Sequence, residues 1–503
     1  MYGPDRCRQE AHQGDDTGRA AASDMDCYSR LPISAVAALM FIPALLSWGE
    51  SELDSLVDEA MANSPTVLAA RARVEQALCR HRELLEFFDP SLYVIGGKSE
   101  RARGVPGSTG FVSGTNNAQE VSGGVEVAVA PGAYVAAGAA ERFLAEPSDY
   151  NHLYQSLLGL RVRVPLLRDR GFSQWDLQRS ASLADFNAVV SGLLVVMQSL
   201  RHDVELAYIS CYETLSAYHV AKEATSRFQG LLDEAGELAR LRVVPEYQVF
   251  PAEMELGLRQ ANELRALQAH ETSLARLSGF LGTGREVGLA SGPEILIELA
   301  GAARLPSDIP LEEALLRRGT YLQLTNQMEG IRAVLRRARD DLRSDVSLNM
   351  GLTWQGESPD AFVGGRSLTS EKAVGGEVVL VWRRPLEFRG ARSRLSRHRA
   401  RIAELKHRLT EVKISTETEL AVGTLTYRRS RERLRALERA LRAARETVSA
   451  EQERFRLGEA RSRNVLDAEK DLTDVLERQT RTAAELLRAR SNVLFASGYE
   501  LDR

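Results

Sequence analysis

The residues of this chain that could do chemistry are few, and their spacing matches no catalytic or cofactor-binding motif. Gly97-Lys98-Ser99 has the ending of a phosphate-binding P-loop, but that loop also needs a glycine five residues before Gly97, where Leu92 stands. The chain contains no G-x-S-x-G nucleophile elbow and no H-E-x-x-H zinc motif, and its histidines are scattered. The cysteines form no C-x-x-C pair; they are Cys7, Cys27, Cys79 and Cys211. We therefore expect no enzyme activity, no cofactor and no metal site.

Composition limits the remaining classes of function. The 503 residues carry 69 acidic and 65 basic side chains, a net charge of −4, which excludes a strongly basic nucleic-acid-binding protein. Hydrophobic residues make up 44% of the chain, as is ordinary for a folded protein. No uninterrupted run of about 18 apolar residues occurs, so the sequence does not predict a bundle of transmembrane helices.

The first 49 residues have the features of a targeting segment. A polar stretch precedes Met25, which is an alternative initiator, and an apolar run of about 14 residues follows from Ile33 to Leu46. This length suits the apolar region of a secretory signal peptide and is short for a spanning helix. Small residues at Ser47 and Gly49 suit cleavage after Gly49. We expect export from the cytoplasm; the alternative is a buried N-terminal helix.

The rest of the chain contains two tandem repeats. Pro165-Leu166 corresponds to Pro385-Leu386, and Arg240-Leu241 corresponds to Arg456-Leu457, in the same order in both halves. The predicted divisions are an N-terminal extension with its signal peptide, a first repeat, a linker and a second repeat: 1–49, 50–282, 283–309 and 310–503.

Each repeat is predicted to contain a first helix, a β region, a very long helix and a closing helix. The helices are expected at 51–87, 172–240 and 248–279, and again at 311–342, 391–456 and 464–496. Pro65 is expected to break the first of them. Apolar residues from Leu183 to Cys211 alternate in steps of three and four, which is the spacing of coiled coils. A helix of this length spans about 100 Å at about 1.5 Å per residue.

The β regions alternate between apolar and polar residues. Strands are expected at 90–98, 156–165, 345–354 and 376–382, with additional β-like sequence at 119–140. Such alternation fits the strands of an outer-membrane barrel, and it also fits a half-buried soluble sheet. Arg161 and Arg163 share one face, which favours contact with a water-filled lumen. Candidate aromatic residues for the membrane interfaces are Tyr93, Tyr154, Trp354 and Trp382.

The chain resembles the TolC-type outer-membrane efflux proteins over about residues 51–498. The likeness depends on the tandem repeat and on several short patterns. The segment 164–171, VPLLRDRG, is similar to the family's joint between strand and helix and has a counterpart at 384–390, RPLEFRG. The segment 454–460, RFRLGEA, with 464–469, NVLDAE, is similar to the family's periplasmic hairpin tip.

This resemblance implies a mixed α/β membrane protein. Three copies would share an outer-membrane β-barrel, with about four strands per protomer, and a long α-helical coiled-coil tunnel would continue into the periplasm. The implied function is a passive export duct of a tripartite efflux or secretion system, without a cofactor. The implied partners are the other two copies of a homotrimer, a periplasmic adaptor, an inner-membrane transporter and outer-membrane lipid, with no nucleic acid.

The resemblance also implies two functional regions. The hairpin tips are expected to contact the adaptor; they comprise Leu241, Arg242, Val243, Val244, Pro245, Leu457, Gly458, Glu459, Ala460 and Ser462. Acidic residues just after the second tip line the closed periplasmic mouth in the family. Asp467 occupies one such position, and Asn464 stands where another acid is common, so the expected pore constriction consists of Asp467 and Asn464. A first-turn helix carboxylate with no role in a pore is the alternative for Asp467.

Two readings of the whole chain remain open at this stage. An export duct is the leading hypothesis, and a coiled-coil scaffold of the cell envelope without a pore is the alternative. The exported substrate, whether drug, metal or polypeptide, is not predictable from the sequence.

Overall fold

The computed structural model describes residues 50–103, 114–129, 132–145, 152–171, 173–242, 245–282, 288–305, 309–358, 374–457 and 459–498. One compact unit, residues 52–499, contains nearly all of them. The predicted leader at 1–49 lies outside the described residues, which begin at Glu50, and it stays a prediction.

The described helices are α3 (Glu50–Asn63), α4 (Pro65–Glu83), η1 (Leu84–Phe88), α5 (Ser173–Arg240), η2 (Glu246–Gln248), α6 (Val249–Leu281), α7 (Ile295–Ala302), α8 (Leu311–Arg317), α9 (Gly319–Asp340), α11 (Arg389–Arg456) and α12 (Ser462–Ala496). The strands are β1 (Ser91–Arg103), β2 (Gly114–Val129), β3 (Ala133–Ala145), β4 (His152–Pro165), β5 (Asp345–Ser358) and β6 (Val374–Arg383).

The two longest helices match their predicted extents closely. Helices α5 and α11 each contain 68 residues, which corresponds to about 100 Å at about 1.5 Å per residue. Pro65 separates α3 from α4 as predicted, because a proline ring prevents continuation of the preceding helix. The division of the chain into two repeats stays a prediction.

Two helical features differ from the prediction. The expected linker at 283–309 contains α7, and the expected helix at 311–342 is divided at Arg318 into α8 and α9. The division has a tertiary cause: a Cβ at Gly319 would lie 2.8 Å from the backbone nitrogen of Val195, so only glycine lets the start of α9 come this close to α5.

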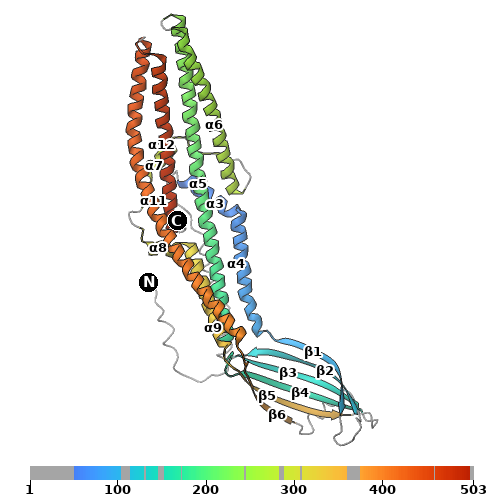
Figure 1. The fold of residues 1–503 in the computed structure, drawn as a ribbon. Coiled ribbons are helices and arrows are strands. Elements are labelled where there is room, and N and C mark those ends of the chain that lie inside the picture. Colours follow the sequence, from blue (N-terminus) through green and yellow to red (C-terminus); the bar gives the residue numbers. More distant parts are fainter. Residues whose placement is uncertain are drawn as a thin grey trace, which may run out of the picture. The chain divides into compact units, whose positions relative to one another are not determined.

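The long helices pack in antiparallel pairs. Figure 1 shows α5 beside α6 and α11 beside α12, with the turn of each pair at the end of the helices away from the sheet. Helix α12 also packs against α5 and thereby joins the two pairs. Below the tips, Phe228, Leu256, Phe455 and Val465 come from all four helices and share one buried cluster. The pairs are therefore held together by a common core near the tips.

Helix α5 also has the apolar character of a membrane helix. It is the one described helix that is long and apolar enough to cross a membrane by composition. Leu200 and Val204 of that helix are buried in a cluster with Val57 of α3 and Leu277 of α6. These side chains contribute to the core of the helical bundle, but only 17% of the most apolar window of α5 is buried in the protomer.

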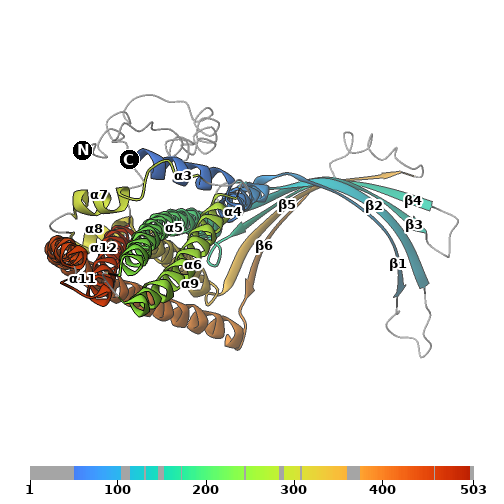
Figure 2. The same ribbon diagram turned by 90° about the horizontal axis from the view of Figure 1, so that it is seen from above.

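The strands form one antiparallel sheet in the order β1-β2-β3-β4-β5-β6. The expectation of about four strands per protomer is wrong for this chain, because the β-like sequence at 119–140 forms β2 and β3 within the sheet. The β2–β3 turn reaches the β4–α5 joint, where a Cβ on Gly132 would overlap the carbonyl oxygen of Gly171. Gly132 adopts a φ of 85°, which glycine accepts without strain. Figure 2 shows the sheet bent into an arc.

Candidate channel wall and helical tips

One face of the sheet is apolar. The pairing register places the following residues on this face: Leu92, Val94, Val121, Val125, Val127, Val135, Leu158, Leu160, Val162, Leu348, Met350, Leu352, Val378 and Leu380. Many of them are exposed in the protomer; Leu92 is 77% exposed and Val378 is 73% exposed. An exposed apolar surface that runs across a whole sheet marks contact with a partner or a membrane.

The apolar stretch has the height of a membrane. On β5 it extends from Val346 to Trp354. Nine residues cover about 30 Å along a strand at about 3.3 Å per residue. A strand tilt of about 40° reduces this to about 23 Å, close to the apolar band of about 25 Å in outer-membrane barrels.

The opposite face is mostly polar. The register places Glu120, Glu126, Arg142, Gln155, Arg161, Arg163, Asn349 and Glu377 on it. Arg142 forms an ion pair with Glu120 at 2.8 Å across neighbouring strands. Arg161 and Arg163 share this face, as their spacing predicted, and both are exposed. An exposed row of charges on one side and apolar residues on the other is the arrangement of a wall between lipid and water.

The candidate aromatic residues divide between the two faces. Tyr154, Trp354 and Trp382 lie on the apolar face. The prediction is wrong for Tyr93, which lies on the polar face. Its hydroxyl would be 2.7 Å from a Cβ on Gly124 and 3.0 Å from a Cβ on Gly138, so the ring lies across two glycines of β2 and β3. Tyr93 therefore packs along the sheet, where it cannot reach lipid.

An aromatic cluster that the sequence did not reveal lies where the sheet meets the helices. The rings of Phe87 and Tyr134 meet edge to face at 6.1 Å, and those of Phe88 and Trp175 meet at 5.2 Å. These residues come from η1, β3 and α5, so their proximity depends on the β2–β3 hairpin. Tyr134 pairs with Arg163 on the polar face of the sheet, so the cluster joins the helices to that face.

The first tip connects α5 to α6. Leu241 and Pro245 are exposed, and Arg242 adopts a φ of 56°, an unusual conformation for a residue with a side chain. The backbone nitrogen of Arg242 donates to the carbonyl oxygen of Ala239 at 3.0 Å, which ends the helix. The predicted tip residues Val243 and Val244 lie outside the described residues.

The second tip connects α11 to α12. The backbone nitrogens of Glu459 and Ala460 both donate to the carbonyl oxygen of Arg454, at 2.9 and 3.2 Å, which closes the turn. Leu457 is exposed, whereas Ala460 and Ser462 are buried. Burial makes Ala460 and Ser462 unsuitable for direct contact with a partner. The predicted Gly458 lies outside the described residues.

A row of exposed apolar residues on η2 and α6 extends the first tip. Tyr247, Phe250, Met254 and Leu258 recur at spacings of three or four residues and are all exposed. Ala252 and Leu256 are buried on the other side of the helix. Sequence reasoning missed this row because α6 has apolar residues on both faces, so their spacing did not distinguish the core from the surface.

Asp467 and Asn464 lie one turn apart on the exposed face of α12. Val465, Leu466 and Ala468 are buried on the opposite side. The Asp467 side chain is 70% exposed, and its Oδ2 lies 3.9 Å from Nε of Arg463. Both predicted constriction residues are therefore free to face a pore. The positive charge of Arg463 beside Asp467 was not part of the prediction.

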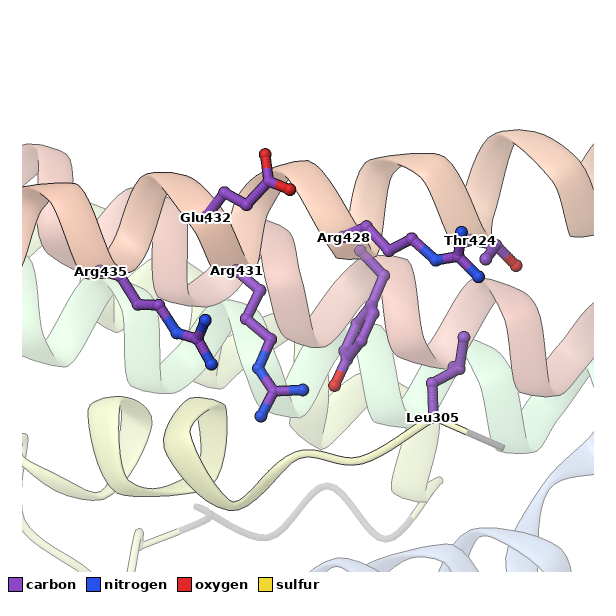
Figure 3. Close-up of a pocket in the computed structure, with 7 residues that line it drawn as sticks. Leu305, Thr424, Arg428, Arg431, Glu432 and Arg435 are labelled. Carbon is purple, nitrogen blue, oxygen red and sulfur yellow. The ribbon is translucent and has the colours of Figure 1, made fainter. Parts of the chain in front are cut away.

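A groove on α11 gathers positive charge. Its cavity of about 310 Å³ lies between α11 and the segment that follows α7. Figure 3 shows the guanidinium groups of Arg428, Arg431 and Arg435 along the groove. The lining residues include no cysteine, histidine or serine. The groove can attract an anionic group, and its single carboxylate, Glu432, is too few ligands to hold a metal ion.

Comparison with known proteins identifies the fold. No protein-family model and no curated protein matches the chain. Among solved structures, CusC, described for transmembrane channel formation, is 15% identical with a TM-score of 0.68, covering 91% of this chain and 97% of its own. The outer membrane protein VceC of Vibrio cholerae is 15% identical with a TM-score of 0.63, covering 89% and 96%. The CmeC outer membrane channel of Campylobacter jejuni is 14% identical with a TM-score of 0.64, covering 90% and 87%.

At these identities the likeness establishes the fold. The chain has the fold of outer-membrane channel proteins, in which a β-barrel segment continues into long helical pairs. The predicted fold class is confirmed, with six strands among the described residues in place of about four. The resemblance to the TolC type is confirmed at the level of the fold.

Proposed function

We propose that this protein is an outer-membrane channel that acts as a passive export duct. The observation that carries the proposal is the two-faced sheet: an exposed apolar face of membrane height stands opposite a charged face. Lipid on the first side and water on the second satisfy both surfaces. The fold shared with solved outer-membrane channels supports the same function.

The open sheet requires assembly. In the part of the chain that the structure describes, the sheet has six strands and open edges at β1 and β6; such a sheet cannot enclose a water-filled pore alone, so several copies must share one barrel. We propose a homotrimer, as the resemblance implies. The protein would be located in the outer membrane, with the helical pairs extending into the periplasm. We propose no catalytic activity and no cofactor.

We further propose that the tips bind a periplasmic adaptor that connects the channel to an inner-membrane transporter. The exposed apolar row on η2 and α6, from Tyr247 to Leu258, supports this proposal because such a row is costly to leave in water. The partner surface would carry apolar residues at matching helical spacing.

Fractionation tests the channel directly. The full chain is expressed in a Gram-negative host, and its outer membranes are separated and treated with a crosslinker. We expect a detergent-extracted trimer that dissociates on heating and conducts ions in planar bilayers. A soluble, rod-like dimer without conductance would instead support the scaffold alternative.

Charge in the apolar row is expected to disrupt docking. The double variant Phe250→Asp/Met254→Asp should abolish most transport in cells while trimers remain in the outer membrane, because two carboxylates would have to be desolvated against an apolar partner. Leu264→Asp is the matched control, since Leu264 is equally exposed on α6 but further from the tip. Equal losses in both variants would argue against a docking role for the tip.

Asp467 is expected to set cation selectivity. Asp467→Asn should lower the permeability ratio of cations to anions in single-channel recordings and weaken block by multivalent cations, because three like charges around an axis attract cations. Arg463→Gln should have the opposite effect, since Arg463 lies beside Asp467 and offsets its charge. Unchanged selectivity in both variants would remove this face of α12 from the pore.

A further inference from the structure

Each edge of the sheet has an uncharged stretch, residues 91–97 of β1 and 378–382 of β6, and β1 carries charges only from Lys98 onward. Edge strands are usually blunted by charges, prolines or bulges, because an unpaired edge invites another strand. β6 has no charged residue between Val378 and Trp382, and β1 presents Val94 with 74% of its side chain exposed. These two edges are therefore suited to pair with further strands.

The stagger of the sheet is that of a closed barrel. A row of directly opposed residues crosses all six strands of the sheet. It starts at Ser91, at the end of β1 nearest the helices, and reaches β6 at Glu377. The helical end of β6 is Arg383, six residues further along. Six residues amount to about 20 Å along the strands, and five strand steps amount to about 24 Å across them. The resulting tilt of about 40° lies within the range of about 35–45° for membrane barrels.

We propose that β6 of each copy pairs with β1 of the next copy, so that three copies close a barrel of eighteen strands. The strand count follows from the six-stranded sheet, and the number of copies rests on the proposed function. The β2–β3 hairpin supplies the additional strands. Because barrel diameter grows roughly linearly with strand number, this barrel is about 1.5 times as wide as one of twelve strands.

The register of the new interface follows from two constraints. The apolar faces of neighbouring copies must be continuous, so even-numbered residues of β1 must face even-numbered residues of β6. The stagger between neighbouring strands within the sheet ranges from zero to three residues and averages about one. If the same stagger continues from β6 of one copy to β1 of its neighbour, Val94 lies opposite Leu380 or Trp382 of the neighbouring copy.

The wide barrel has a consequence for the substrate. A lumen about 1.5 times as wide has roughly twice the cross-section, because area grows with the square of the diameter. The outer part of the duct is therefore wide enough to admit folded or bulky solutes, such as polypeptides. Its width is not matched to small molecules. The charged polar face, with Arg161 and Arg163, keeps this lumen wetted.

Disulfide crosslinking tests the strand pairing. Val94→Cys is combined with Leu380→Cys or Trp382→Cys in the full chain that also carries Cys79→Ser, and the outer membranes are oxidised. We expect one of these pairs to form covalent dimers and trimers. Val94→Cys with Val379→Cys is the control, because Val379 lies on the opposite face. A link within one copy, or equal linking in the control, would overturn the pairing.

Polymer exclusion tests the width. A variant lacking residues 114–151 keeps β1, β4, β5 and β6 in antiparallel order and would close with twelve strands. Polyethylene glycols added on the sheet side of trimers in planar bilayers should enter the wild-type barrel at a hydrodynamic diameter about 1.5-fold larger than in the variant. Equal cut-offs would refute the widening, whereas absence of any membrane trimer in the wild type would refute the proposed function. If the variant does not fold, the crosslinking result alone decides the pairing.

Discussion

Replacing Arg227 with methionine is expected to lower the free energy of unfolding of the helical bundle by about 3 kcal/mol. The carboxylate of Glu469 is fully buried, and Nε of Arg227 donates to it at 2.8 Å. Gln452 donates from Nε2 at 3.1 Å to its other oxygen. Without Arg227 the charge of Glu469 would stay buried with only an amide partner. Denaturant unfolding of the purified protein in detergent, followed by far-ultraviolet circular dichroism, measures the loss.

Two further variants separate the charge effect from general damage. Arg227→Met/Glu469→Leu removes both charges and should recover most of the lost stability, since a buried ion pair can be replaced by apolar residues at little cost. Arg408→Met removes an exposed partner of Glu404 and should change stability by less than about 0.5 kcal/mol. A double variant as unstable as Arg227→Met would show that packing at this position matters more than charge.

Gln198→Leu is expected to have an effect of similar size at a different junction. The buried Gln198 amide donates from Nε2 to the carbonyl oxygens of Arg317 and Gly498, at 3.0 and 2.7 Å. Its Oε1 accepts from the backbone nitrogen of Gly319 at 3.1 Å. Leucine has a similar volume but would leave three backbone groups without these partners, at about 1–3 kcal/mol for each group that stays buried.

Gln229→Leu is the matched control for this experiment. Gln229 lies on the same helix, is exposed, and bonds to Asp233 at 3.0 Å. Its loss should change stability by less than about 0.5 kcal/mol. Both variants would be compared by thermal unfolding in the same detergent. Equal melting temperatures for the two variants would contradict the role of Gln198 in joining α5, α9 and the end of α12.

The helices were predictable where local sequence determines them. Repeated apolar spacing placed α5 and α11 within two residues of their observed ends, and Pro65 marked a break that depends on proline chemistry alone. The break at Arg318 was not predictable, since it depends on the close approach of Gly319 to Val195, a residue far away in the chain. Local patterns do not contain such tertiary contacts.

In the sheet, too, local sequence determined some features and tertiary contacts determined others. Alternation predicted four strands and the shared face of Arg161 and Arg163. Alternation left open whether the segment 119–140 adds strands to the sheet, because that segment could equally have formed a hairpin outside it. The prediction for Tyr93 was wrong because side chains alternate along a strand, so Tyr93 lies on the face opposite to Leu92 and Val94.

The site was predictable only in part. The positions of Asn464 and Asp467 on one exposed face follow from helical spacing. The burial of Ala460 and Ser462 was not predictable, since it arises from the core shared by both helical pairs. The exposed row on α6 became recognisable only when Ala252 and Leu256 were seen to be buried, because the sequence alone contains two competing apolar faces.

The strand order of the sheet has a consequence for how the chain folds. Strands β1 to β4 pair with their sequence neighbours, as do β5 and β6, so these pairings need only short loop closures. The pairing of β4 with β5 brings Pro165 opposite Ser347. Helices α5 to α9 separate these two strands in the sequence, so the strands can pair only after this segment has folded back. Closure of such a long loop is entropically costly and slow. The four strands of the first half can therefore pair before β5 is available, which leaves the edge of β4 exposed to mispairing during folding.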